Sequence, residues 1–505
     1  MNTKELKAGA IFSYLLIIAN TLYALIFTPF LISALGDGEY GVYKIIGSLT
    51  SSITILDLGI GSTMLRYIAK FRAEKDEKNL SNFSAMGFIQ AAVLSGIMVV
   101  VCIILYFFID SLYDQSLTPA ELGQAKRLFI LFIIILVFNT FEKVVFSIIS
   151  GCEHYIFANA LKLVTLILKV LLAFAILSRF ANSVFLLVIE IGLLFLVITI
   201  QLIYIKVKIK IKIHYYFWDG KLFKQSFHYT ILMFIQSIAV QFNGNLDNIV
   251  IGAVEGAAIV AVYSIGLQLY GMYEQFALAF SDLMLPTVSR QIAQGATTQQ
   301  LEDTVIKVGR LEFIALGGAL CGYILIGKEF IELWLGASYA PAWIVGLILM
   351  IPTTIPLIQN VCLSILRAKN KMGFRTIAVC SMAIFNLLIT IIGVKYYGFM
   401  AACIGTAIGL IGANIIAMNI YYVKVIKLNI GRIFKGILSH TWLCCLVASF
   451  GLWMADRFIG GNWGLWIIKV LIFLSIYGIM LFLYGFNKSE KNMLGGKFYR
   501  LIKRR

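Results

Sequence analysis

The chain has 505 residues, of which 60% are hydrophobic and only 13% are charged; its mean hydropathy is +0.91. Soluble domains carry about 25% charged residues, so this chain lacks the polar side chains needed to cover a water-facing surface. The composition therefore predicts an all-α polytopic membrane protein. It excludes a soluble enzyme, a DNA-binding protein and a disulfide-stabilised scaffold. The net charge of +17 is first interpreted as a signal of membrane topology.

Apolar stretches long enough to cross a bilayer recur along the whole chain. A transmembrane helix needs about 20 mostly apolar residues, and about 14 stretches reach that length. They lie near 10–34, 41–66, 85–109, 127–150, 156–178, 183–205, 228–252, 257–285, 309–327, 341–366, 375–394, 399–422, 434–455 and 464–486. The first resembles a signal peptide, but it is too long and has no convincing cleavage site, so we interpret it as a span.

Lysine and arginine are distributed unequally between the two sides of the predicted membrane. Most of the 42 basic residues fall in the termini and in one set of loops, near 66–78, 206–224, 290–310, 367–375 and 424–435. Basic loops favour the cytoplasmic side, so we expect both termini in the cytoplasm. These residues also attract anionic lipid headgroups. Because they are spread over every inner loop, they do not indicate nucleic acid as a partner.

The two halves of the chain share a pattern of span, short turn and span. ISALGDGEYGVY (32–43) and IGAVEGAAIVAVY (251–263) occupy corresponding places in the two halves. We therefore predict six-helix bundles at 1–215 and 216–425, followed by two additional helices and a basic cytoplasmic tail at 426–505. A unit with an even number of spans keeps its orientation, so the repeats are parallel, and transporters of this kind bind substrate between their halves.

Several segments carry a family resemblance. LGDGEYGVY (35–43) and LDLGIGSTMLR (56–66) resemble the first helical hairpin of Wzx-like polysaccharide flippases, which belong to the multidrug/oligosaccharidyl-lipid/polysaccharide exporter superfamily. NLDNIVIGAV (245–254) and AVYSIG (261–266) are similar to the start of that family's second half. The likeness covers about residues 8–425.

The resemblance implies a function. Such flippases move undecaprenyl-pyrophosphate-linked oligosaccharides from the inner to the outer leaflet of the bacterial cytoplasmic (inner) membrane by alternating access, and they act with polysaccharide assembly proteins. The product is a surface polysaccharide. The sequence leaves open whether this is the O-antigen of lipopolysaccharide, a capsule, a teichoic acid or an exopolysaccharide.

Polar residues in the second span form a candidate substrate surface. At helical spacing, Tyr43, Thr50, Thr54 and Asp57 share one face, with Lys44 beside it. We expect this stripe to line a wet cavity, because a helix-packing face, the alternative, does not need a carboxylate. Asp57 also matches the family's DLG pattern, which can mark a structural helix end near the cytoplasm.

The fourth and fifth spans carry intramembrane charges. Glu142 and Lys143 follow Asn139 by one turn, and Lys169 lies on the fifth span. We predict that Lys143 and Lys169 attract the anionic head of the substrate. The alternative is a structural ion pair between Glu142 and Lys169, since intramembrane charges often pair with one another. Lys162, on the same face as Lys169, can extend to the cytoplasmic interface.

The seventh and eighth spans supply carboxylates and tyrosines. Asp247 and Glu274 are candidate groups for coupling to H⁺ or Na⁺, and consecutive spans could place them side by side. Asp247 could instead cap a helix. Tyr263 and Tyr270 are candidates for stacking on sugar rings. Glu190 in the sixth span is isolated and has no assigned role.

No enzymatic signature is found. The sequence contains no Walker A, GxSxG or HExxH motif, and no cysteine–histidine cluster indicates a metal, so we expect neither a catalytic centre nor a cofactor. One alternative function is a multidrug cation antiporter of the same superfamily, which needs a mainly acidic cavity. Another is a membrane polysaccharide polymerase or glycosyltransferase. That activity needs a large external loop, and the longest here lies near 110–124.

Overall fold

The computed structural model describes residues 3–217, 220, 245–281, 285–369, 371–457, 461–487 and 490–491, and at 3–14, 279–281 and 285–287 it describes the backbone alone. Throughout these residues the regular structure is helical, with no strand. The prediction of an all-α fold is therefore confirmed.

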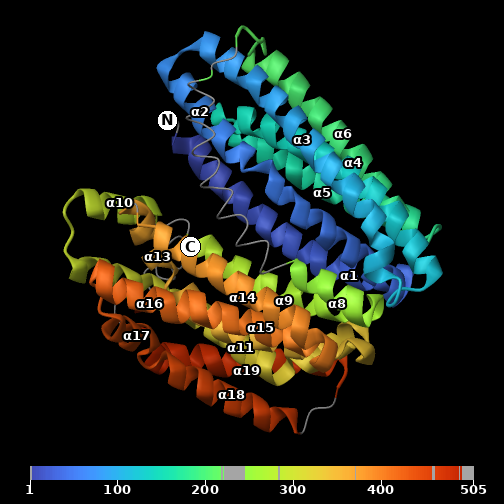
Figure 1. Ribbon diagram of the computed structural model, residues 1–505. Coiled ribbons are helices and arrows are strands. Elements are labelled where there is room, and N and C mark those ends of the chain that lie inside the picture. Colours follow the sequence, from blue (N-terminus) through green and yellow to red (C-terminus); the bar gives the residue numbers. More distant parts are fainter. Residues whose placement is uncertain are drawn as a thin grey trace, which may run out of the picture. The chain divides into compact units, whose positions relative to one another are not determined.

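The helices divide between two compact units, and each is described by itself (Figure 1). The first unit spans 1–264 and 383–402, and the second spans 265–382 and 403–505. The first contains α1 (Thr3–Ile53), α2 (Ile60–Glu74), α3 (Glu77–Tyr113), α4 (Pro119–Gly151), α5 (Tyr155–Leu177), α6 (Ser183–Tyr204) and α8 (Leu246–Glu255). The predicted domain boundaries at 215 and 425 stay a prediction.

Three helices have residues in both units. The helices named after them belong to the second unit alone. The shared helices are α9 (Ala257–Ser281), α14 (Gly373–Tyr397) and α15 (Phe399–Leu410). The second unit also contains α10 (Leu285–Ala293), α11 (Thr298–Leu335), α12 (Ala342–Ile358), α13 (Asn360–Ala368), α16 (Met418–Tyr421), α17 (Ile430–Leu438), α18 (Thr441–Asp456) and α19 (Trp463–Met480).

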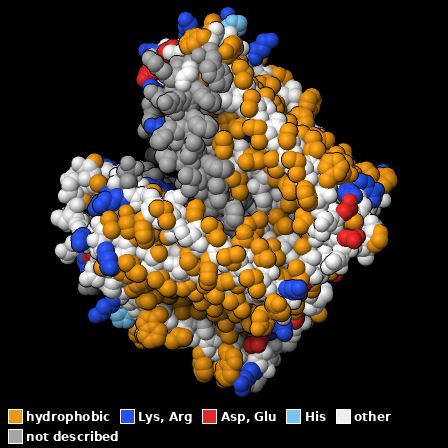
Figure 2. Space-filling view, viewed as in Figure 1, with side chains coloured by type: hydrophobic (Ala, Val, Ile, Leu, Met, Phe, Trp, Pro, Cys, Tyr) orange, Lys and Arg blue, Asp and Glu red, His pale blue; other side chains and the backbone are white. Residues whose placement is uncertain are grey.

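The described helices include many that could cross a membrane. Ten helices are long and apolar enough, or eleven if the bent pair α17 and α18 forms one span. One of the ten, Leu15–Glu74, runs across two predicted spans, and most of the predicted span 228–252 lies outside the described residues. The described part of the chain is therefore consistent with about 14 spans. Figure 2 shows hydrophobic side chains over broad outer faces of the helices, as a lipid-facing surface requires.

Gly41 allows α1 to pack closely against the start of α9 within the first unit. A Cβ built on Gly41 would overlap the carbonyl oxygen of Ala257, at the start of α9. Gly41 belongs to the GEYGVY segment on which the family resemblance rests. Only a residue without a side chain permits this approach of two backbones.

We therefore expect Gly41→Ala to destabilise the protein by about 1–3 kcal/mol, because overpacking forces backbone shifts. The measurement is the thermal unfolding temperature of the purified protein in detergent. Gly96→Ala in α3 is the matched control, since a Cβ there meets nothing within 4 Å. Equal unfolding temperatures for the two variants would contradict the expectation.

Buried ion pairs tie the C-terminal helices to α11 in the second unit. The Arg310 side chain is 2% exposed; it donates from Nε to Glu490 at 2.9 Å and from Nη1 to the Ser439 carbonyl at 2.8 Å. Lys469 Nζ lies 2.8 Å from Glu329 and 2.6 Å from Asp456. Sequence analysis placed Arg310 in a basic loop and did not identify these pairs.

Candidate functional site

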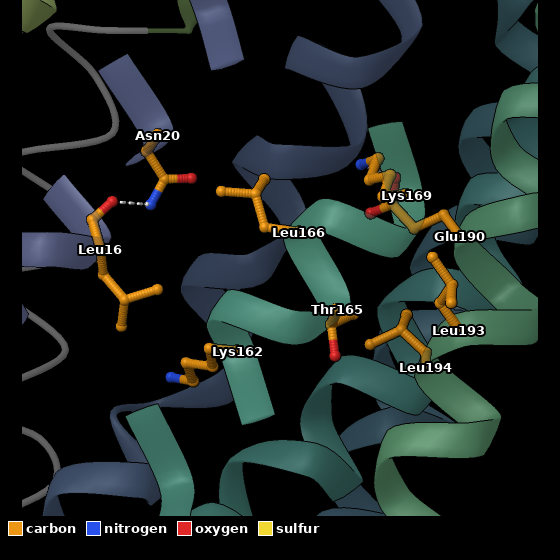
Figure 3. A pocket seen from close by; sticks show the side chains of 9 residues that line it. All are labelled: Leu16, Asn20, Lys162, Thr165, Leu166, Lys169, Glu190, Leu193 and Leu194. Atoms are coloured by element: carbon orange, nitrogen blue, oxygen red, sulfur yellow. Dashed lines mark hydrogen bonds and ion pairs between the residues drawn. The ribbon is translucent and has the colours of Figure 1, made fainter. Parts of the chain in front are cut away.

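A cavity of about 300 Å³ lies inside the first unit, among α1, α5 and α6. Its wall combines leucines with polar side chains from all three helices (Figure 3). The lining residues are Leu16, Asn20, Lys162, Thr165, Leu166, Lys169, Glu190, Leu193 and Leu194. Two lysines and one carboxylate therefore share a small space within the helical bundle.

Lys169 in this cavity is paired with a carboxylate. Its Nζ lies 2.7 Å from Glu190 Oε2, and both side chains are about one-quarter exposed, at 25% and 27%. The predicted alternative, a pair between Lys169 and Glu142, is wrong. Glu142 Oε1 instead accepts a hydrogen bond from Gln201 Nε2 at 3.2 Å. Glu190, which sequence analysis left without a role, is the true partner because α6 presents it to α5.

Lys162 lines the same cavity without such a partner. Its Nζ lies 3.6 Å from the centroid of the Phe146 ring. No carboxylate lies within ion-pair distance of it among the described residues, although Glu142 interacts with it electrostatically. Lys44, outside this cavity, also lies near an aromatic ring: its Nζ is 5.2 Å from the Tyr40 ring centroid. A cation held over an aromatic face keeps its charge available to a further anion. Lys162 is thus the lysine of the cavity best placed to receive an anionic group.

Lys143 has a different environment from Lys169. It forms an ion pair with Asp57, and its side chain is not part of the cavity wall. Asp57 also accepts a hydrogen bond from Gly59 N at 2.7 Å. The pair therefore fixes α4 to the break between α1 and α2. Asn139 lies one turn earlier on α4 and is half-buried.

The polar stripe predicted on one continuous helix is interrupted. α1 ends at Ile53, and a 3₁₀ turn at Thr54–Asp57 precedes two residues with left-handed backbone, Leu58 and Gly59. The break is the helix-end feature that the DLG pattern suggested. It overturns the single helical face assumed for Thr54 and Asp57, because these residues lie in a 3₁₀ turn, which has about 3.0 residues per turn and does not continue the period of about 3.6 residues of α1.

The other stripe residues make local contacts in the first unit. Thr50 Oγ1 donates to the Ile46 carbonyl at 2.8 Å, and Thr54 Oγ1 donates to the Ser51 carbonyl at 2.6 Å. The rings of Tyr43 and Phe132 lie 5.8 Å apart. Neither threonine lines the cavity, and their predicted role in substrate binding stays a prediction.

Asp247 lies in a second polar cluster of the first unit. It is 2% exposed; its Oδ2 accepts from Tyr263 Oη at 2.8 Å and its Oδ1 accepts from Thr390 Oγ1 at 3.3 Å. Thr390 also lies 3.4 Å from Asn386 Oδ1. A carboxylate surrounded by hydroxyl and amide oxygens has the ligand chemistry that hard cations prefer. Sequence analysis missed Thr390 and Asn386, which α14 brings to this place.

Tyr270 and Glu274 belong to the second unit. The Thr353 hydroxyl donates to Tyr270 Oη at 3.4 Å. Glu274 lies one helical turn farther along α9 and is half-buried. Because Asp247 belongs to the first unit, a joint role of the two carboxylates in ion coupling stays a prediction.

A family model and several solved structures resemble this chain. A sequence-family model described as "Polysaccharide biosynthesis protein" matches residues 6–292. A comparison with curated protein sequences gives no significant match.

Solved membrane transporters share the fold. The structure of the lipid II flippase MurJ, in an inward closed conformation, is 16% identical with a TM-score of 0.71, and the match covers 94% of this chain and 97% of that chain. An inward-facing multidrug resistance MATE family transporter of the MOP superfamily is 15% identical with a TM-score of 0.68, over 82% of this chain and 95% of that one. A eukaryotic MATE transporter gives 13% identity and a TM-score of 0.56, over 86% and 98%.

Proposed function

Because the chain belongs to the polysaccharide biosynthesis protein family, we propose that it is a flippase for a lipid-linked oligosaccharide. Its family and fold are those of multi-pass membrane flippases and transporters, as the sequence resemblance implied. The proposed substrate is an undecaprenyl-pyrophosphate-linked oligosaccharide. It would move from the inner to the outer leaflet of the bacterial cytoplasmic membrane for surface polysaccharide synthesis, with both termini of the protein in the cytoplasm.

The observation that carries this proposal is the cationic cavity of the first unit. Lys162 lines the cavity with no carboxylate within ion-pair distance in the described structure, and the Lys169–Glu190 pair lines another part of the same cavity. Pyrophosphate is a strong acceptor for charge-assisted hydrogen bonds, and an ionisable residue at membrane depth indicates a substrate pathway. Lys162 would hold the pyrophosphate while the lipid chains remain in the bilayer.

The driving force can come from the membrane potential and from an ion. Moving an anion outward across an inside-negative membrane is favourable by about 2.3 kcal/mol per charge per 100 mV. We further propose that Asp247, with the oxygens of Tyr263 and Thr390, exchanges H⁺ or Na⁺ during the cycle. Carboxylate and hydroxyl oxygens are ligands that hard cations prefer, and a carboxylate can also take up a proton.

The second candidate is export of organic cations, which the multidrug transporters among the structural relatives favour. Organic cations need an acidic cavity. The cavity of the first unit instead carries two lysines and one glutamate, a composition that favours an anionic substrate.

Ligand binding separates these two functions. The purified protein in nanodiscs is titrated with an undecaprenyl-pyrophosphate-linked oligosaccharide and, separately, with a fluorescent organic cation, and the unfolding temperature is measured. We expect the lipid-linked glycan to raise the unfolding temperature, because a ligand that binds the folded state stabilises it. A rise with the organic cation alone would refute the flippase assignment.

A further inference from the structure

A second cavity of the first unit is strongly basic and lies apart from the first. It measures about 510 Å³ and is formed where α2 ends, α3 begins and the chain leaves α6. Its wall contains Arg72, Lys78, Lys210 and Lys212 against one carboxylate, Glu77, an excess of three positive charges (4 − 1). Within the described residues, none of these five side chains forms an ion pair.

The wall of this cavity is held in place by specific hydrogen bonds. The segment 211–217, which has no regular secondary structure, runs beside the first turns of α3, where Ser81 and Asn82 are buried. Ser81 Oγ accepts from His214 N at 3.0 Å, and Asn82 Oδ1 accepts from Tyr216 N at 2.8 Å. The backbone that carries Lys212 is thus held against α3, while the side chains of Lys210 and Lys212 are exposed.

Tyr216 is the aromatic residue that lines the basic cavity, and Phe217 follows it in the chain. Lys78 Nζ lies 5.9 Å from the ring centroids of both Tyr216 and Phe217. Tyrosine is typical of the membrane interface, where lipid headgroups lie. The cavity therefore combines interfacial aromatic residues, an uncompensated positive charge and a rigid backbone.

We propose that this cavity binds the phosphate group of an anionic membrane lipid. Basic pockets between transmembrane helices on the cytoplasmic side recognise such headgroups, and phosphate forms strong charge-assisted bonds with arginine and lysine. The lipid could be an anionic glycerophospholipid or a polyprenyl pyrophosphate, since both present phosphate at the end of apolar chains. Binding of a glycerophospholipid requires only that this end of the helices lie at the cytoplasmic face of a membrane, whereas binding of a polyprenyl pyrophosphate rests on the proposed function.

Retention of lipid by the purified full-length protein tests this site. Lys78→Gln/Lys212→Gln removes two cations of the cavity, and Lys206→Gln/Lys208→Gln removes two exposed lysines that are close in sequence but do not line it. Native mass spectrometry then measures binding of phosphatidylglycerol, of undecaprenyl pyrophosphate and of inorganic pyrophosphate. We expect the cavity variant to bind phosphatidylglycerol or undecaprenyl pyrophosphate about thirtyfold more weakly, and the control variant to bind as the unchanged protein does.

The lipid that responds identifies the source of the phosphate. Loss of phosphatidylglycerol binding assigns the site to a membrane phospholipid. Loss of undecaprenyl pyrophosphate binding alone, measured with Lys162→Gln present in every variant so that the first cavity does not contribute, assigns it to the carrier lipid. Equal lipid binding by both double variants would overturn the proposal. Binding of inorganic pyrophosphate as tight as that of either lipid would also overturn it, because the site would then recognise a free anion.

Discussion

Lys162→Gln is expected to lower the rate of lipid-linked glycan transport by about tenfold or more, because a charge-assisted hydrogen bond contributes about 1.5–3 kcal/mol. The variant should accumulate in the membrane at its normal level, since Lys162 lies over the Phe146 ring and has no carboxylate partner in the described structure. Transport is measured in proteoliposomes and abundance by immunoblot. Lys126→Gln, which breaks a pair with Asp110 at 2.6 Å outside the cavity, is the control and should transport normally.

The neighbouring pair gives an independent test of the same cavity. Lys169→Gln leaves Glu190 without its cation, so we expect lower protein abundance as well as lower transport. The double change Lys169→Gln/Glu190→Gln should restore abundance, because it removes both charges together. If it also restored full transport, Lys169 would be a structural residue only, and its predicted contact with the substrate would be wrong.

Asp247→Asn is expected to abolish the stimulation of transport by an imposed ion gradient while sparing slow exchange driven by the substrate concentration. The amide keeps the size of the side chain but cannot bind a proton or balance a cation. Tyr263→Phe should reduce the stimulation less, because it removes one hydrogen bond of 2.8 Å to Asp247 and leaves the carboxylate.

The measurement is the initial rate in proteoliposomes with and without a proton or sodium gradient. Asp110→Asn, which changes a partly exposed carboxylate elsewhere in the first unit, is the matched control and should leave the gradient response intact. Unchanged gradient dependence in both Asp247→Asn and Glu274→Gln would rule out a coupling role for these carboxylates. The membrane potential or removal of the substrate would then be the driving force.

The class of fold could be predicted from composition and from the length of the apolar stretches. Every span must satisfy its own backbone hydrogen bonds in lipid, so an apolar stretch of sufficient length has little choice but a helix. The break after Ile53 was predicted only in part: the DLG pattern suggested a helix end, but the polar stripe was assumed to continue on one helix to Asp57.

The partners of the intramembrane charges could not be predicted in the same way. Lys169 pairs with Glu190, and this choice depends on how far α5 and α6 are rotated about their axes. The sequence specifies which face of a helix carries a charge, but a charged face can meet several neighbours. Arg310 was missed for a related reason, since its burial depends on the return of the C-terminal helices onto α11.

The most direct test of the flippase assignment is a flipping assay in proteoliposomes. Vesicles containing the purified protein receive a fluorescent undecaprenyl-pyrophosphate-linked oligosaccharide in both leaflets, and a membrane-impermeant reductant quenches the outer leaflet over time. We predict that the unchanged protein carries the inner-leaflet lipid outward faster than protein-free vesicles do, and that Lys162→Gln slows this movement. Equal rates with the unchanged protein and without protein, under an inside-negative potential and an ion gradient, would contradict the assignment.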